Sequence, residues 1–556
     1  MKARPGAAVG ETGADGLIPV ALRRYLPALE TLAQLHTMRR AIPILALLAA
    51  ACTPGTPDSA SPDSLYAAAA TITPEDMRSR IGFLAADELR GRDTPSPGLE
   101  TAARWIADEL ASFGVQPAGD DGWFQRYPYP AEALEAARVR LDASAGRTHS
   151  FEYGTEFFAR GGRSVPAAVG VVVAGSGIPE PAEALRGQTV VVRLEGLPEA
   201  GRRGFGFGRA MERSIRQVRE QAGAAGAAAV LFVLDARITA GEVAALAEAA
   251  EEPGRRYGAL EDVDRPVPAF FVARPAVDHL LRMAGLNPAI VDGATPRPIP
   301  LEGLTLGLAA PVVPIDDARP PNVVGVLPGS DSALAGTYVV VSAHMDHVGV
   351  GRPDATGDSI YNGADDDASG TSALVEVAQA LARLEPRPRR SVLFLAVSGE
   401  EKGLLGSRWF SDHPTVPIDS VVANINIDMV GRNAPDSIVV IGMEYSTLGA
   451  TVREVARDHG DDLGLTVSED LWPDQRFFFR SDHFHFARRE VPVLFFFAGT
   501  HEDYHRPSDE VETVDVDKAA RVARLVFYLT YALADATERP EWDPQGLESV
   551  RAFTEN

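Results

Sequence analysis

Short apolar runs alternate with amphipathic segments from about residue 320 onward, and this alternation restricts the fold more than any other feature of the sequence. An apolar run bounded by turn residues predicts a strand buried on both faces, and apolar residues at helical spacing predict a covering helix. The expected strands are YVVVSA (338–343), RSVLFLAVSG (390–399), VVANINIDMVG (421–431) and VPVLFFFAG (491–499). We therefore predict an α/β fold, with a mostly parallel mixed sheet that carries helices on both faces.

The stretch from about residue 165 to 300 has a different pattern. It contains strand-like runs such as VGVVVAG (169–175) and AAVLFVLD (228–235), but no His, Asp and Glu cluster with the spacing of metal ligands. The glycine-rich GRRGFGFGRA (201–210) lacks the motif and context of a phosphate-binding loop, so we predict a flexible loop there. The predicted domains are a main domain, an insert and a tail: 73–160 with 305–540, 161–304, and 541–556.

The single cysteine, Cys52, ends a segment with the layout of an export signal. Residues 38–52 (MRRAIPILALLAAAC) join two arginines, an apolar run too short to span a bilayer, and small residues before the cysteine. This pattern is typical of bacterial lipoproteins. We predict export to the periplasm or cell surface, a lipid anchor on Cys52, a flexible tether over 53–72, and an upstream extension over 1–37 that precedes the true start at Met38.

The formal net charge of −24 restricts the partners of the chain. Nucleic acids and anionic membranes attract basic patches, so neither is an expected partner. Contact with a membrane is predicted only through the lipidated Cys52. One cysteine also excludes disulfides within the chain and cysteine-rich zinc sites.

Histidines and carboxylates follow the ends of the predicted strands. The carboxyl ends of parallel strands meet at one edge of a sheet, so we expect these side chains to lie close together. Packed carboxylates repel one another and take up protons unless a cation lies among them. The side chains are His344, Asp346, His347, Asp365, Asp366, Asp367, Glu400, Glu401, Asp428, His501, Glu502, His505 and Asp509. Their clustering predicts a metal site.

Imidazole and carboxylate ligands without thiolates suit zinc, with cobalt and manganese as alternatives. The number of histidine and carboxylate ligands is sufficient for two ions about 3.5–4 Å apart, provided that one carboxylate bridges them. A different reading of HEDYH (501–505) is the HExxH motif, in which both histidines lie on one helix. We reject this reading because the motif follows a strand-like run, and because Pro507 disfavours a helical conformation at Arg506.

These motifs resemble, in type and order, those of the M28 family of metallo-aminopeptidases, which use two co-catalytic zinc ions. The resemblance covers about residues 74–160 and 310–535, and the insert resembles the protease-associated (PA) domain that several members carry at this point. The matching segments are SAHMDHVG (342–349), GADDDASG (363–370), SGEEKG (398–403), NIDMVG (426–431) and YHRPSDE (504–510).

The resemblance implies a set of metal ligands: His344, Asp366, Glu401, Asp428 and His505. Asp366 would bridge the ions, with His344 and Asp428 on one ion and Glu401 and His505 on the other. Asp346 would orient the ring of His344 from behind. Neither His347 nor His501 is expected to be a ligand, and Asp365 and Asp367 are expected to form hydrogen bonds within their loop.

The resemblance also implies the catalytic groups. Glu400 would act as general base and then general acid, without contacting metal. Tyr504 would stabilise the oxyanion, because the alternative tyrosine position of the family, three residues before Ser481, is Phe478 here. The segment RSDHFHF (480–486) is expected to support the pocket.

The implied activity is hydrolysis of N-terminal residues from peptides with a free amino terminus. Two alternatives within the fold remain open: a glutaminyl cyclase-like enzyme with a single zinc, and a carboxypeptidase-like relative. A non-catalytic receptor would be expected to lack a ligand or the base, but all six of these positions are occupied.

Overall fold

The computed structural model describes residues 59–175, 177–178, 182–201, 204–258, 265–293 and 298–554. The predictions for 1–37, for the signal 38–52 and for the lipid anchor at Cys52 fall outside these residues. The predicted tether (53–72) is wrong from Pro62 onward, because helix α1 (Pro62–Ala69) begins there and packs against the main domain. Among the described residues, no helix is both long and apolar enough to cross a membrane.

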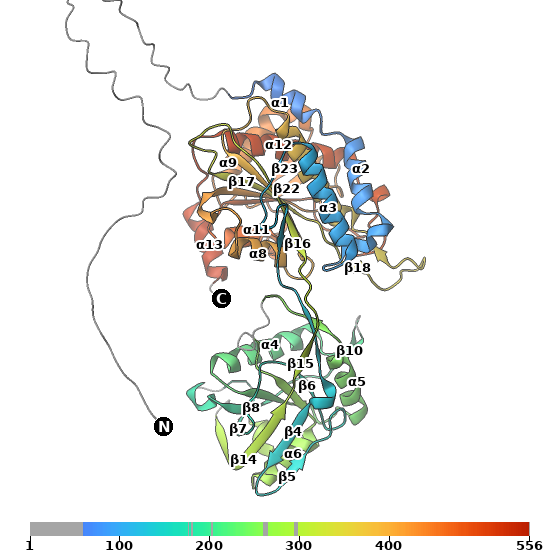
Figure 1. Cartoon of the computed structure of the whole chain (residues 1–556), viewed down its shortest axis with the longest axis vertical. Helices are drawn as coiled ribbons and strands as arrows, with labels where there is room; N and C mark the ends of the chain where they lie inside the picture. The colour runs from blue at the N-terminus through green and yellow to red at the C-terminus, as the bar shows by residue number, and fades with distance from the viewer. Residues whose placement is uncertain are drawn as a thin grey trace, which may run out of the picture. The chain divides into compact units, whose positions relative to one another are not determined.

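A nine-stranded sheet forms the frame of the main domain (Figure 1). Its path is β1 (Gln116–Pro117), β16 (Pro321–Leu327), β20 (Ser391–Val397), β17 (Tyr338–His344), β21 (Val421–Ile427), β24 (Val493–Phe497), β22 (Ser437–Ile441) and β23 (Thr466–Ser468), with β2 (Phe124–Arg126) paired to β16. The central strands β20, β17, β21 and β24 are mutually parallel, whereas β16 and β22 run antiparallel to their neighbours in this group. The predicted mixed sheet is therefore confirmed.

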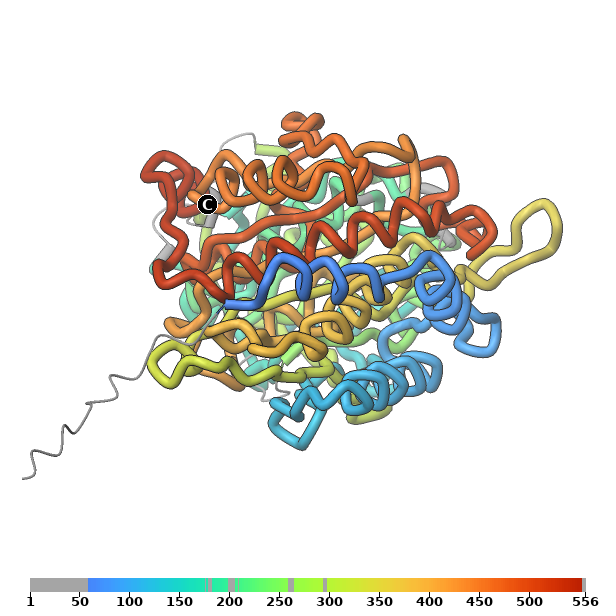
Figure 2. Tube along the Cα trace, turned by 90° about the horizontal axis from the view of Figure 1, so that it is seen from above, coloured from blue at the N-terminus to red at the C-terminus, as the bar shows by residue number. Residues whose placement is uncertain are grey.

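Helices cover both faces of this sheet, as predicted. Successive residues of a strand point to opposite faces, so Val339 and Val341 lie in one apolar core and Val340 lies in the other. The first core is covered by α1, α2 (Pro74–Leu84), α3 (Pro97–Ser112), α7 (Gly370–Ala382), α9 (Leu448–Asp458) and α12 (Val516–Asp535). Figure 2 shows α12 lying beside α1 on this side.

The second face is covered by α8 (Leu405–Asp412), α11 (His483–Ala487) and α13 (Pro544–Thr554). Val550 of α13 is 2% exposed and belongs to this second core. The segment 541–556 was predicted as a tail, and that prediction is wrong because α13 packs on the sheet.

Local sequence signals explain where the first helices start. The Thr73 hydroxyl accepts a hydrogen bond from the amide of Asp76, and Pro74 occupies the first turn of α2. The Ser96 hydroxyl caps α3 in the same way through the amide of Leu99.

The insert is built on its own eight-stranded sheet. The path of this sheet is β5 (Thr148–Ser150), β4 (Arg140–Ser144), β14 (Ile299–Ala309), β7 (Val169–Gly175), β8 (Gln188–Arg193), β11 (Ala229–Val233), β13 (Ala269–Val272) and β6 (Phe157–Arg160). Helices α4 (Arg209–Ala224), α5 (Ala240–Glu251) and α6 (Arg274–Met283) complete it. Strands β4, β5 and β6 pair within this sheet, and the first of them starts at Arg140. The insert therefore begins before residue 161, where its boundary was predicted.

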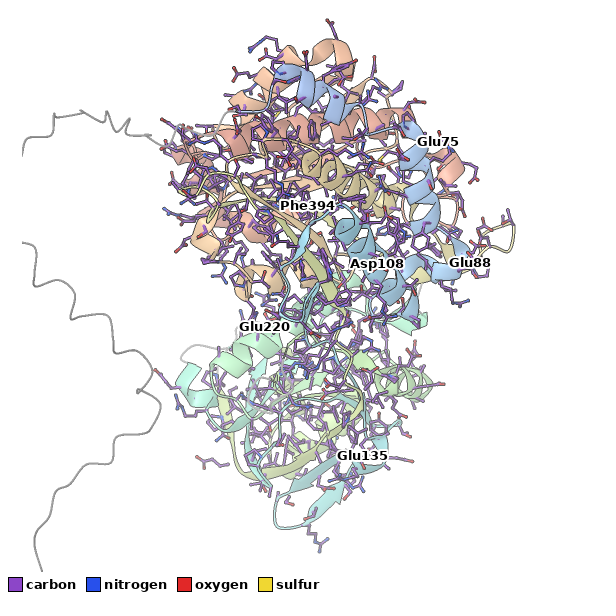
Figure 3. All side chains as sticks on the ribbon, turned by 45° about the horizontal axis from the view of Figure 1, so that its top comes forward. Glu75, Glu88, Asp108, Glu135, Glu220 and Phe394 are labelled. Carbon is purple, nitrogen blue, oxygen red and sulfur yellow. The ribbon has the colours of Figure 1, made fainter. Side chains whose placement is uncertain are left out.

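We expect Phe394→Ala to lower the free energy of unfolding by about 3–5 kcal/mol, because truncating a buried phenylalanine leaves a cavity. Phe394 lies in the middle of β20 and is 0% exposed, whereas Asp108 of α3 is exposed to solvent; both residues are labelled in Figure 3. Asp108→Ala is the matched control and should change stability by no more than about 0.5 kcal/mol. Urea unfolding of both variants measures the effect, and an equally small loss for Phe394→Ala would contradict it.

Candidate metal centre

The predicted site residues meet at the carboxyl edge of the parallel strands. His344 is the last residue of β17, Glu400 and Glu401 follow β20, and Asp428 directly follows β21. The loop after β24 carries His505. Neighbouring parallel strands therefore place side chains from distant parts of the sequence beside one another.

The carboxylate of Asp366 lies between two histidines. Its Oδ1 is 3.3 Å from Nε2 of His344, and its Oδ2 is 3.1 Å from Nε2 of His505. His344 Nε2 is also 3.5 Å from Oδ1 of Asp428, and His505 Nε2 is 2.9 Å from Oε1 of Glu401. The five predicted ligands thus form two donor groups that share Asp366.

The neighbours of Asp366 hold its loop through hydrogen bonds. Asp367 accepts hydrogen bonds from the amides of His344, Gly370 and Met429, so both of its oxygens are engaged. Asp365 accepts one from the amide of Gly431. Asp509, which the sequence placed in the predicted cluster without an individual role, accepts hydrogen bonds from the amides of Asp365 and Asp366.

The ring of His344 is oriented by the main chain. Its Nδ1 lies 3.1 Å from the backbone carbonyl oxygen of Asp346 but 3.8 Å from that residue's carboxylate. The carboxylate instead accepts hydrogen bonds from the Thr94 hydroxyl and the Glu400 amide. Asp346 therefore positions the turn that carries Glu400 and orients His344 through its carbonyl, not through its side chain as expected.

A buried chain of polar side chains supports Asp428. The Ser481 hydroxyl donates to Oδ2 of Asp428 at 2.8 Å and accepts from the side-chain Nδ2 of Asn426 at 2.9 Å. Asn426 in turn accepts from the hydroxyl of Ser342. RSDHFHF (480–486) thus supports the site through Ser481, and the asparagine of NID was a signal that sequence reasoning left unused.

Arg92 is a further residue that sequence reasoning missed. It is fully buried, and its guanidinium donates to the backbone carbonyls of Leu84, Met345, Asn362 and Gly363. Desolvation lowers its pKa to about 10, although nearby carboxylates oppose this shift. Arg92 thus joins the loop of Met345, which follows His344, to the loop of Asn362 and Gly363, which precedes Asp366.

Burial raises the pKa values of several carboxyl groups at the site. Burial raises the pKa of Glu400 well above its ordinary value, against the opposing charge of His344. Burial also raises the pKa of Asp346 to about 6 and that of Asp482 to about 7. A carboxyl that resists ionisation in this way releases its proton more readily when a cation lies nearby.

A pocket opens over the shared carboxylate. Its polar lining includes Glu400, Asp428 and Tyr504, and its apolar lining is formed by Met429, Phe477, Phe495 and Phe497. The ring of Tyr504 stacks on His505 with a centroid separation of 3.9 Å. Phe478 lies outside this lining and contacts Tyr445 and His483 instead, so among these two positions only residue 504 presents a phenol to the pocket.

The donor atoms fit divalent cations. Oδ2 of Asp366, Oε1 of Glu401 and Nε2 of His505 are buried and make no hydrogen bond. Buried polar atoms normally have partners, and histidine nitrogens with carboxylate oxygens are ligands that zinc favours. The residues therefore match the expected metal.

The histidine pair of HEDYH does not lie on a helix. Residues 501–508 form turns, and His505 has a φ of 54°. Nε2 of His501 is 3.3 Å from Oδ2 of Asp365, away from the shared carboxylate. Rejection of the HExxH reading is confirmed.

Comparison with protein families matches residues 322–530 to the profile described as Peptidase family M28. Among curated relatives, a probable zinc metalloprotease of Pyrenophora tritici-repentis is 28% identical over 219 residues, covering 32% of this chain and 45% of that protein. Aminopeptidase YwaD of Bacillus subtilis is 26% identical over 215 residues, covering 36% and 42%. The chain thus spans less than half the length of these relatives.

Among solved structures, the aminopeptidase from Aneurinibacillus sp. strain AM-1 has a TM-score of 0.47 and 18% identity, covering 85% of this chain and 97% of that one. The zinc aminopeptidase BSAP from Bacillus subtilis has a TM-score of 0.43 and 19% identity, covering 84% and 96%.

Proposed function

From the premise that this chain carries a domain of peptidase family M28, we propose that it is a zinc-dependent aminopeptidase that removes N-terminal residues from peptides. The observation that carries this proposal is the pair of donor groups joined by Asp366, which lines a pocket together with His344 and Asp428. Relatives described as aminopeptidases and zinc metalloproteases support the same reading.

Two zinc ions are proposed, with cobalt or manganese as alternatives. His344 and Asp428 would hold one ion, Glu401 and His505 would hold the other, and Asp366 would bridge them. Bound there, the ions would lower the pKa of a water molecule and polarise the carbonyl of the scissile peptide bond.

Glu400 is the proposed proton carrier. It lines the pocket beside the donor groups, while its backbone amide is held by Asp346. Its carboxylate would accept a proton from the attacking water and return it to the nitrogen of the leaving amine. Burial, reinforced by the neighbouring carboxylates, raises the pKa of Tyr504, so the phenol stays protonated and can donate a hydrogen bond to the carbonyl oxygen as negative charge develops.

The charge of the pocket favours a substrate with a free amino terminus. Glu400, Asp366 and Asp428 all line it, and an α-amino group complements their negative charge. One observation favours a carboxypeptidase-like activity instead: Arg480 also lines the pocket, and a guanidinium binds carboxylates well. The insert is proposed to be a PA-like domain, in keeping with its mixed sheet and three long helices.

We expect the full-length protein to hydrolyse leucine p-nitroanilide and free peptides, and to lose roughly 10²-fold or more of kcat/KM on N-acetylated peptides, because acetylation removes the charged amine. Dialysis against a chelator should abolish turnover, and zinc should restore it. Mass spectrometry of the products identifies the end that is cleaved. Release of C-terminal residues would favour the carboxypeptidase alternative, and cyclisation of N-terminal glutamine with one zinc per chain would favour the cyclase.

A further inference from the structure

His347 has the surroundings of a metal ligand, although its sequence position did not indicate one. Its side chain is 0% exposed, and neither ring nitrogen makes a hydrogen bond. Nδ1 nevertheless lies 3.0 Å from Oε1 of Glu401 and 3.6 Å from Oδ2 of Asp366. A fully buried imidazole that makes no hydrogen bond is costly unless something binds its lone pair.

Four buried atoms without hydrogen bonds face one another here: His347 Nδ1, His505 Nε2, Asp366 Oδ2 and Glu401 Oε1. The four contacts measured between the histidine nitrogens and the carboxylate oxygens range from 2.9 to 3.6 Å. Ligands about 2.0–2.1 Å from a tetrahedral zinc ion are roughly 3.3 Å apart. These four separations therefore match the spacing of tetrahedral ligands, and one ligand atom from each of the four residues lies within 4.8 Å of the others.

The surrounding backbone is shaped to admit this ring. Gly363 has a φ of +60°, and a Cβ there would lie 2.5 Å from Cγ of His347 and 2.2 Å from the carbonyl oxygen of Asp366. Arg92 links Gly363 to His347: its guanidinium donates to the carbonyl of Gly363, and its backbone carbonyl accepts a hydrogen bond from the amide of His347.

We propose that His347 is a fourth protein ligand of the ion held by Asp366, Glu401 and His505. This inference rests on the proposed two-zinc function and makes the two sites unequal. The His347 site has four protein donors, whereas the site of His344, Asp366 and Asp428 has three. The His347 site binds zinc more tightly, and the three-donor site is the one that loses its zinc ion more readily.

The test is zinc affinity, measured by competition with graded chelators and by metal content after dialysis of the full-length protein. Wild type should release its ions in two separate steps. His347→Ala should lower the affinity of the tighter site by at least about 100-fold, the upper end of what losing an outer-shell partner costs. His501→Ala is the matched control, since it removes another buried histidine of the same edge that lies outside the four-atom set, and both affinities should stay within a few-fold of wild type.

A second variant guards against a folding defect. His347→Asp retains a ligand oxygen, so it should recover part of the affinity lost by His347→Ala, and the visible spectrum of the Co²⁺-loaded protein should report the altered donor. If His347→Ala binds two ions with wild-type affinity and an unchanged Co²⁺ spectrum, the inference is overturned while the proposed function stands. If wild type itself fails to bind two ions, the proposed function fails with it.

Discussion

Glu400→Gln should lower kcat by roughly 10²–10⁴-fold while both zinc ions remain bound, because the amide cannot accept the proton of the attacking water. The side chain lines the pocket but belongs to neither donor group. Glutamine preserves its shape, so KM and the fold should change little. Single-turnover hydrolysis of a free peptide measures the rate of the chemical step, and metal analysis of the same sample measures the zinc content.

Glu401→Gln is the matched contrast, since the two glutamates are adjacent in sequence and differ in contacts. Oε1 of Glu401 is 2.9 Å from His505 and 3.0 Å from His347, so this variant should lose zinc first and activity as a consequence. Excess zinc should then restore much of the activity of Glu401→Gln and none of that of Glu400→Gln. The role of Glu400 would be refuted if its glutamine variant kept near wild-type turnover with both ions bound.

The frame of the site could be predicted because its signals are local. An apolar run such as SVLFLAV predicts a buried strand by itself, and the rule for parallel sheets then places the residues that follow it at one edge. The same reasoning explains why Glu400, Asp428 and His505 could be predicted to lie close together although they are far apart in the sequence.

The supports of the site could not be predicted, because they depend on contacts between distant segments. Thr94 reaches the carboxylate of Asp346 across 252 residues, and Arg92 reaches the carbonyl of Gly363 across 271. Nothing in ELRGRD distinguishes a buried arginine from an exposed one, since arginines are mostly exposed. His347 was not expected to be a ligand, because the family resemblance assigns that role to His344. The missing hydrogen bonds that indicate a ligand appear only once the ring is placed.

The boundary of the insert was misplaced for a related reason. Strands β4, β5 and β6 lie just before residue 161, and their sequences are short and mixed in polarity. Strand β4 belongs to the insert because it pairs with β14, and β6 because it pairs with β13, each more than 100 residues away. Strand β5 follows through its pairing with β4. Strand pairing over such separations is not encoded in a local pattern.

Asp366→Asn should have the broadest effect of any single substitution, because one carboxylate faces both donor groups. Its oxygens lie 3.3 Å from Nε2 of His344 and 3.1 Å from Nε2 of His505, so the amide removes a negative charge from both proposed sites at once. We expect zinc content to fall from two ions to fewer than one per chain after dialysis, and kcat/KM to fall by roughly 10³-fold or more. Metal analysis and turnover in graded zinc measure the two effects.

Asp365→Asn is the matched control, since it makes the same chemical change one residue earlier. Asp365 accepts a hydrogen bond from the amide of Gly431 and approaches His501, so its loss should cost about 1.5–3 kcal/mol of stability while the donor groups remain intact. Zinc content near two ions for Asp365→Asn and below one for Asp366→Asn would identify the bridge. If Asp366→Asn retained both ions, the two sites could not share that carboxylate, and the paired arrangement that supports the proposed chemistry would have to be abandoned.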